Sequence, residues 1–158
     1  MNELSEQFPY ITALCISTGG IPKRTVDQVY VTMAGLEGDG HNHAKHNTPL
    51  QAVCLQDEEA LEHMRAQGFS LFQGTIGENL TVRNLQVQKL PVGTVLEFSG
   101  GVVLELTKER KPCYVLDTID LRLKEAVIGR CGMYARVVQG GILTVGETIQ
   151  AKYLVGIS

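Results

Sequence analysis

The chain has 158 residues, 44% of them hydrophobic and 20% charged, which suits one domain, residues 1–158, with a substantial core. The formal net charge of −3 and the pI near 5.8 favour neither nucleic acid nor an anionic membrane as partner. Residues 1–7 are acidic where a secretory signal needs positive charge, and no apolar run is long enough to span a bilayer.

The four cysteines, Cys15, Cys54, Cys113 and Cys131, form no C-x-x-C pair and have no tight spacing. This argues against a zinc ribbon and against a small disulfide scaffold. Without an export signal we expect a cytoplasmic protein, because free thiols persist in that reducing compartment.

Short apolar segments separated by glycine and proline predict a mainly β protein. We expect strands at residues 10–17, 28–33, 50–55, 79–82, 95–98, 102–106, 133–138 and 148–155. About eight short strands at close spacing favour a closed or nearly closed β-barrel over a parallel α/β sheet.

Two helices are predicted beside the strands. Asp57 is typical of an N-cap, two glutamates follow in the first turn, and Gly68 supplies a C-terminal stop. Apolar residues at helical spacing predict a second helix over residues 116–127, ending at Gly129. The expected architecture is therefore a barrel with two or three peripheral helices.

Cys113 is the first candidate for chemistry, since it follows Arg110, Lys111 and Pro112. Neighbouring cations lower the pKa of a thiol, and the thiolate is the form that attacks electrophiles, carries sulfur or binds a soft metal. The alternative is a half-buried thiol beside a solvated run of charge. Cys15 and Cys54 lie in apolar strands and are expected to be inert, and Cys131 is expected to pack.

Residues 35–46 form a second candidate, which contains Gly38, Asp39, His41, His43 and His46. Three histidines suggest a metal site, but their spacing needs distant ligands to complete it. A substrate- or anion-binding loop is a second interpretation, because glycines let backbone N–H groups approach oxygen atoms. A solvated loop is the third.

Two further groups of polar residues leave alternatives open. Glu78 and Asn79, after the glycines of residues 74–77, can hydrogen-bond a polar heterocycle or simply belong to a turn. Arg136 suits a phosphate or carboxylate, as Arg130 does, but an ion pair with Glu97 or Glu105 explains it equally well.

Several of these segments, in this order, resemble the MOSC domain, the module named after the C-terminal part of molybdenum-cofactor sulfurases. The resemblance covers about residues 19–150. Its motifs are Gly35-x-x-Gly38-Asp39-x-His41 with His46, Gln51-Ala52-Val53, Gly77-Glu78-Asn79-Leu80, Lys111-Pro112-Cys113, Gly132-x-Tyr134-Ala135-Arg136-Val137 and Gly140-Gly141-x-x-x-x-Gly146-Glu147-x-Ile149.

The resemblance implies a MOSC-type, pyruvate-kinase-like β-barrel that binds molybdenum cofactor (molybdopterin) or carries sulfur, and no pyridoxal phosphate. It places the ligand to molybdenum, or the sulfur carrier, on Cys113. The cofactor-binding residues it implies are Gly38, Asp39, His41, His46, Glu78, Asn79, Arg110, Lys111 and Arg136. Residues 46–49 depart from the His-Gly-Gly turn of many members.

The resemblance leaves the activity open between a molybdenum-dependent oxidoreductase, acting on N-hydroxylated compounds, and a sulfurtransferase. A non-catalytic carrier that delivers molybdopterin is one alternative, and a metal-binding barrel built on His41, His43 and His46 is another. Expected partners are a small-molecule cofactor or substrate and a protein of cofactor biosynthesis or redox transfer, with no nucleic acid and no membrane.

Overall fold

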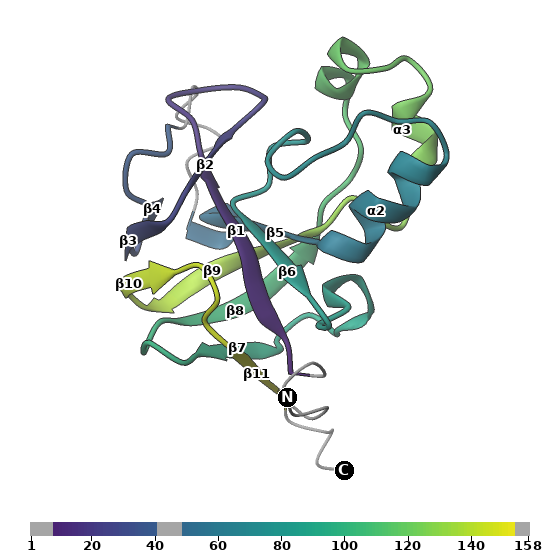
Figure 1. The fold of residues 1–158 in the computed structure, drawn as a ribbon. Helices are drawn as coiled ribbons and strands as arrows, with labels where there is room; N and C mark the ends of the chain where they lie inside the picture. The colour runs from purple at the N-terminus through teal and green to yellow at the C-terminus, as the bar shows by residue number, and fades with distance from the viewer. Residues whose placement is uncertain (1–7, 41–48, 154–158) are drawn as a thin grey trace.

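The computed structural model describes residues 8–40 and 49–153 (Figure 1). Eight strands form a large mixed sheet in the order β11-β7-β8-β9-β5-β6-β1-β2. They are β1 (Tyr10–Ile16), β2 (Arg24–Val26), β5 (Val53–Asp57), β6 (Leu80–Arg83), β7 (Val95–Phe98), β8 (Val103–Glu109), β9 (Met133–Gln139) and β11 (Ile149–Lys152). A smaller sheet joins β10 (Gly141–Thr144), β3 (Gln28–Thr32) and β4 (Gly35–Leu36).

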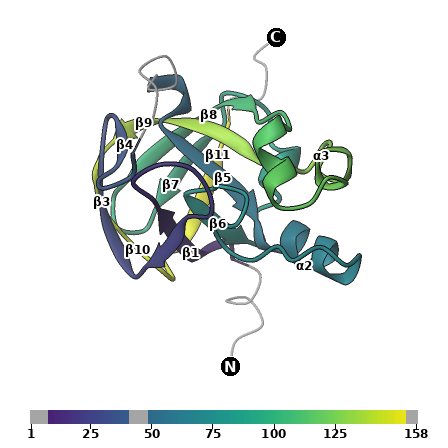
Figure 2. The ribbon, with the colours of Figure 1, turned by 90° about the horizontal axis from the view of Figure 1, so that it is seen from above.

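The mainly β class predicted from the sequence is confirmed, but the described residues form no closed barrel. The end strand β11 does approach β1, the neighbour of the other end strand, β2. The N–H of Ile11 donates to the carbonyl of Glu147 at 3.0 Å, and the N–H of Ile149 donates to the carbonyl of Pro9 at 3.0 Å. An isolated bridge pairs Tyr10 with Thr148. This contact consists of one bridge and a few hydrogen bonds. The strands therefore curl around the core, as Figure 2 shows, without a continuous ladder of hydrogen bonds that closes a barrel.

Most predicted strands occur close to their expected positions, and three short ones were missed. Strand β5 begins at Val53 rather than residue 50, because Pro49–Gln51 form a 3-10 turn, η2. The missed strands are β2, β4 and β10. They are two to four residues long and adjoin glycine- or proline-rich turns, so their sequences carry turn signals instead of an apolar run.

Helix α2 (Glu58–Ala66) is confirmed, with Asp57 at its N-cap position. The Asp57 side chain does not cap it; its carboxylate accepts the N–H of Val87 at 2.8 Å instead. Gly68, with φ near +100°, ends the helical turn as predicted. Because β5, α2 and β6 are consecutive, the helix lies in the connection between the sheet's parallel pair, β5 and β6.

The single helix predicted over residues 116–127 is wrong. This stretch forms a 3-10 turn, η4 (Tyr114–Thr118), and one short helix, α3 (Leu123–Ala126). Asp120 lies between them, and its carboxylate accepts the N–H of Arg122 at 2.8 Å. An aspartate that bonds its own local backbone competes with helix formation, and here it separates the two pieces. A further 3-10 turn, η3, spans Val87–Lys89.

Apolar side chains gather in two clusters. The sheet core lies inside the curled strands and includes Ile11, Leu55, Leu80, Leu104 and Ala135. The helix core lies under α2, η4 and α3, and consists of Leu61, Met64, Phe69, Leu71, Ile76, Leu116, Leu123, Val127 and Cys131. In the described part of the chain, no helix is long and apolar enough to cross a membrane.

Candidate functional site

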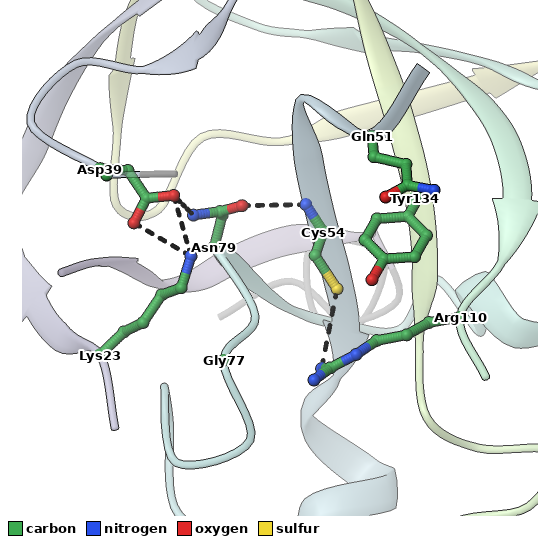
Figure 3. A pocket seen from close by; sticks show the side chains of 9 residues that line it. Lys23, Asp39, Gln51, Cys54, Gly77, Asn79, Arg110 and Tyr134 are labelled. Atoms are coloured by element: carbon green, nitrogen blue, oxygen red, sulfur yellow. Dashed lines mark hydrogen bonds and ion pairs between the residues drawn. The ribbon is translucent and has the colours of Figure 1, made fainter. Parts of the chain in front are cut away.

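A polar pocket of about 160 Å³ opens where the ends of several strands meet (Figure 3). Its walls come from the turns before β2 and β6, the segments after β4 and β8, the turn η2 and the strands β5 and β9. The lining residues are Lys23, Asp39, Gly40, Gln51, Cys54, Gly77, Asn79, Arg110 and Tyr134.

One wall is a hydrogen-bonded unit centred on Asp39, whose side chain is 3% exposed. Lys23 Nζ lies 2.9 Å from Asp39 Oδ2, the side-chain amide of Asn79 donates to the same oxygen at 3.0 Å, and the N–H of Ser17 donates to Oδ1 at 3.0 Å. Asn79 Oδ1 in turn accepts the N–H of Cys54 at 3.0 Å. These bonds satisfy the buried carboxylate and fix the wall, as burial of a charge requires.

Close packing of the backbone explains why position 40 is a glycine. Its N–H donates to the carbonyl of Ser17 at 2.7 Å, and a Cβ at position 40 would lie 1.9 Å from the carbonyl oxygen of Thr18. Only glycine permits this approach of the segment after β4 to the end of β1. The contact places Asp39 against Lys23 and Asn79.

The facing wall is a row of cross-strand neighbours. Cys54 on β5 pairs with Tyr134 on β9, and Tyr134 pairs with Lys108 on β8. Residues opposite each other on one face of a sheet interact directly, and the Lys108 ammonium lies 5.8 Å from the Tyr134 ring centre. In Figure 3 the Tyr134 hydroxyl and the Cys54 sulfur both point toward the Arg110 guanidinium.

Arg110 closes this side of the pocket and is 9% exposed. Its Nη2 donates to the carbonyl of Ile76 at 2.6 Å, and its Nη1 lies 4.0 Å from Cys54 Sγ. Its backbone N–H donates to the carbonyl of Gly132 at 3.0 Å. Burial by itself lowers the pKa of the guanidinium, but the Cys54 sulfur and other acidic groups outweigh it, so the pKa is raised and Arg110 stays cationic.

Glu78 lies next to the lining residues Gly77 and Asn79 and is fully buried. Its Oε2 accepts the N–H of Gly74 at 3.0 Å and the hydroxyl of Thr81 at 2.8 Å, whereas Oε1 has no partner among the described residues. Burial raises the pKa of Glu78 against the lowering effect of these hydrogen bonds. Glu78 therefore stabilises the wall of the pocket but is not one of the lining residues.

Cys113 is the exposed member of the four cysteines, and it stands at the N-terminal end of η4. The other three are buried. Burial raises the pKa of Cys15 to about 12 and of Cys131 to about 11, and it also raises the pKa of Cys54. Burial likewise raises the pKa of Tyr134, and Cys113 is among the neighbours that raise it further. Cys113 is therefore the one of the four thiols that solvent reaches.

The structure brings together three of the cofactor-binding residues predicted from the sequence, Asp39, Asn79 and Arg110. Gly38 is next to them in the chain and has φ near +87°. Lys111 is exposed and pairs with Glu109, and Arg136 forms an ion pair with Glu105 at 2.5 Å, one of the two alternatives for it. Neither of these two cations lines the pocket. His41, His43 and His46 lie outside the described residues.

Sequence reasoning missed the contribution of Cys54 and Lys23. Strand β5 is buried along its whole length, so the apolar run around Cys54 held no sign that one side chain meets a pocket. Nothing around Lys23 distinguishes it from a solvated lysine. Tyr134 did have a signal, because it and Arg136 alternate in the sequence with the apolar residues Met133, Ala135 and Val137, as on a strand with one buried face.

The fold and pocket define a mainly β protein of known architecture. The YUAD protein from Bacillus subtilis has a solved structure that superposes with a TM-score of 0.79 over 92% of this chain and 97% of that one. The two sequences are 17% identical, so this likeness concerns the fold.

The chain belongs to the MOSC domain family, whose model matches residues 42–150. It is 28% identical over 141 residues to a protein named Reductase from Gibberella moniliformis, covering 84% of this chain and 25% of that protein. It is 28% identical over 143 residues to the uncharacterized protein YflK of Bacillus subtilis, covering 85% of this chain and 63% of YflK. The chain thus spans less than two thirds of either relative.

Proposed function

We propose that this MOSC protein binds molybdenum cofactor at the Arg110 pocket, with Cys113 as the ligand to molybdenum or as the carrier of a sulfane sulfur. The observation that carries the proposal is the position of Cys113. It is the exposed thiol of the four, and it follows by three residues a buried, pocket-lining arginine.

The residues present fit the chemistry of this cofactor. A cysteine sulfur is a soft ligand suited to a thiophilic metal, and a persulfide is a reversible cysteine modification. Arg110 offers a fixed cation for the anionic part of the cofactor. Asp39, held by Lys23 and Asn79, keeps the opposite wall in place. When bound, the cofactor supplies a redox-active metal centre.

The name of the Gibberella relative, Reductase, supports reduction as the reaction class. For this chain we propose N-hydroxylated compounds as substrates and a redox protein as partner, as the resemblance to the MOSC domain implies. Sulfur transfer from Cys113 is the second activity that the exposed thiol supports. We place the protein in the cytoplasm, where four free cysteines stay reduced.

Native mass spectrometry with metal analysis tests the proposal on protein made in a molybdopterin-competent host. We expect the wild type to carry molybdenum with pterin, or one additional sulfur atom, and Cys113→Ser to lose these while keeping its circular dichroism spectrum. The matched control is Cys15→Ala, which removes a buried thiol and should retain the cargo. A Cys113→Ser protein that keeps both molybdenum and extra sulfur contradicts the proposal.

The same preparation separates the activity classes. Turnover of an N-hydroxylated base with an added electron donor supports the oxidoreductase. Bound molybdopterin without turnover supports a carrier that delivers the cofactor to another protein. Stoichiometric zinc or iron that is lost on His41→Ala supports the histidine metal site instead.

A further inference from the structure

Arg110 is a buried cation that has no carboxylate within ion-pair distance in residues 8–40 and 49–153. A guanidinium has five N–H donors. The acceptors recorded for them are the Ile76 carbonyl at 2.6 Å and the Cys54 sulfur at 4.0 Å, which is a weak contact. By contrast, Arg136, Arg122 and Arg83 pair with Glu105, Asp120 and Glu62. Burying a charge costs free energy unless the charge is paired, so an anion bound next to Arg110 would be stabilised there.

The rest of the pocket does not supply that anion. Lys23 and Asp39 neutralise each other as an ion pair with 2.9 Å between Nζ and Oδ2. Burial raises the pKa of Glu78, which favours its neutral form. The described lining therefore has a net positive charge, and that charge is on Arg110.

The size of the pocket limits the ligand. A cavity of about 150 Å³ holds a molecule the size of benzene, and pockets for drug-sized ligands have about 300–1,000 Å³. The present pocket has about 160 Å³, which leaves room for a phosphate- or sulfate-sized group. The Tyr134 hydroxyl points toward the Arg110 guanidinium, as Figure 3 shows, and Gln51 also lines the pocket.

We propose that the Arg110 pocket is a binding site for a tetrahedral oxyanion, a phosphate or sulfate group, either as the free ion or as the anionic end of a larger ligand. The inference rests on the proposed function in taking this pocket as the ligand site, and it names the group that the pocket selects. It assigns the anion to Arg110 and excludes Lys111 and Arg136, which are exposed or paired with glutamate.

Calorimetric titration and thermal shift with inorganic phosphate, inorganic sulfate and phenyl phosphate test the site. We expect wild-type protein to bind phosphate and to melt at a higher temperature as its concentration rises. Arg110→Met should weaken binding at least about tenfold, because a charge-assisted hydrogen bond is lost. Arg110→Lys, which keeps the charge but not the planar fork, and Tyr134→Phe should each weaken it less.

Lys111→Gln and Arg136→Gln are the matched controls, since each removes one positive charge outside the pocket. They should change the affinity less than about twofold beyond the general effect of salt. Equal affinity for phosphate and phenyl phosphate identifies a free ion as the ligand, and a tighter monoester identifies the anionic end of a larger molecule. If Arg110→Met does not fold, Arg110→Lys and Tyr134→Phe decide the matter.

The proposal is overturned if wild-type protein binds none of the three anions, or if both control variants lose as much affinity as the Arg110 variants. Its failure is distinguishable from failure of the proposed function. Cys113→Ser should bind phosphate like the wild type whether or not it carries molybdenum or sulfur, because Cys113 does not line the pocket.

Discussion

Cys54 and Cys113 show how strongly the surroundings control the exposure and ionisation of a cysteine. Cys113, beside cationic neighbours in the sequence, is exposed, whereas Cys54 is 5% exposed and still lines the pocket next to Arg110. Burial raises the pKa of Cys54 and the nearby Arg110 lowers it, with burial the larger effect. Cys54 therefore contributes a neutral thiol, and Cys113 is the accessible sulfur.

The substitution Glu78→Gln tests how burial of the Glu78 carboxyl group affects stability. Burial raises the native pKa of Glu78 above its ordinary value of 4.5. Its stabilising contribution is therefore present below that value and is lost as the pH rises through the native pKa. A glutamine amide resembles the protonated acid, so the free energy of unfolding of Glu78→Gln should exceed that of the wild type increasingly above pH 4.5, by at most about 1.4 kcal/mol per pH unit.

Urea unfolding at a series of pH values measures this difference. The exposed Glu125→Gln is the control and should show a smaller dependence on pH. A constant difference between Glu78→Gln and the wild type at all pH values contradicts the assignment.

At the scale of elements, the segment after Cys113 packs against the helix core through Leu116. Turn η4 begins directly after Cys113, and its Leu116 is 0% exposed in the helix core beside Leu61 and Leu123. Asp120 then breaks the helical pattern before α3. The position of the exposed thiol thus depends on apolar packing three residues further along the chain.

Leu116→Ala should reduce the free energy of unfolding by about 2–5 kcal/mol, because it leaves a cavity in the helix core. Leu121→Ala removes the same atoms from a side chain that is 80% exposed, in the same segment, and should cost less than about 0.5 kcal/mol. Chemical denaturation measures both. Similar losses for the two variants would show that η4 does not depend on the helix core.

At the scale of the whole molecule, the two cores are connected through the strands that build the pocket. The Gln56 amide of β5 donates to the carbonyl of Arg130 at 2.8 Å, next to Cys131 of the helix core. Gly132, with φ near +105°, follows at once, and a Cβ there would lie 2.4 Å from the carbonyl oxygen of Leu55 in the sheet core. The helix layer and the sheet therefore share buried backbone contacts.

These contacts predict cooperative unfolding of both cores. Urea transitions followed by far-ultraviolet circular dichroism and by tyrosine fluorescence should coincide, since the chain has five tyrosines and no tryptophan. Two separated transitions would show instead that the layer of α2, η4 and α3 unfolds independently of the sheet.

Local patterns in the sequence were enough to predict the mainly β class, most of the strands and α2. These patterns are apolar runs bounded by glycine and an acidic helix start. The sequence also pointed to Asp39, Asn79 and Arg110, which the structure places in one pocket. The broken second helix was not predicted because Asp120 interrupts an otherwise helical spacing of apolar residues. The short strands β2, β4 and β10 were not predicted because turn residues dominate those stretches.

The pairing of charges and the contacts between side chains could be read only from the folded chain. Lys111 and Arg136 have the same charge as Arg110 in the sequence, but Arg136 meets Glu105 across the pair of β8 and β9, and Lys111 is exposed beside Glu109. Cys54 and Tyr134 meet because β5 and β9 pair in one register. Pairing and burial arise from contacts between distant segments, and a local pattern does not contain them.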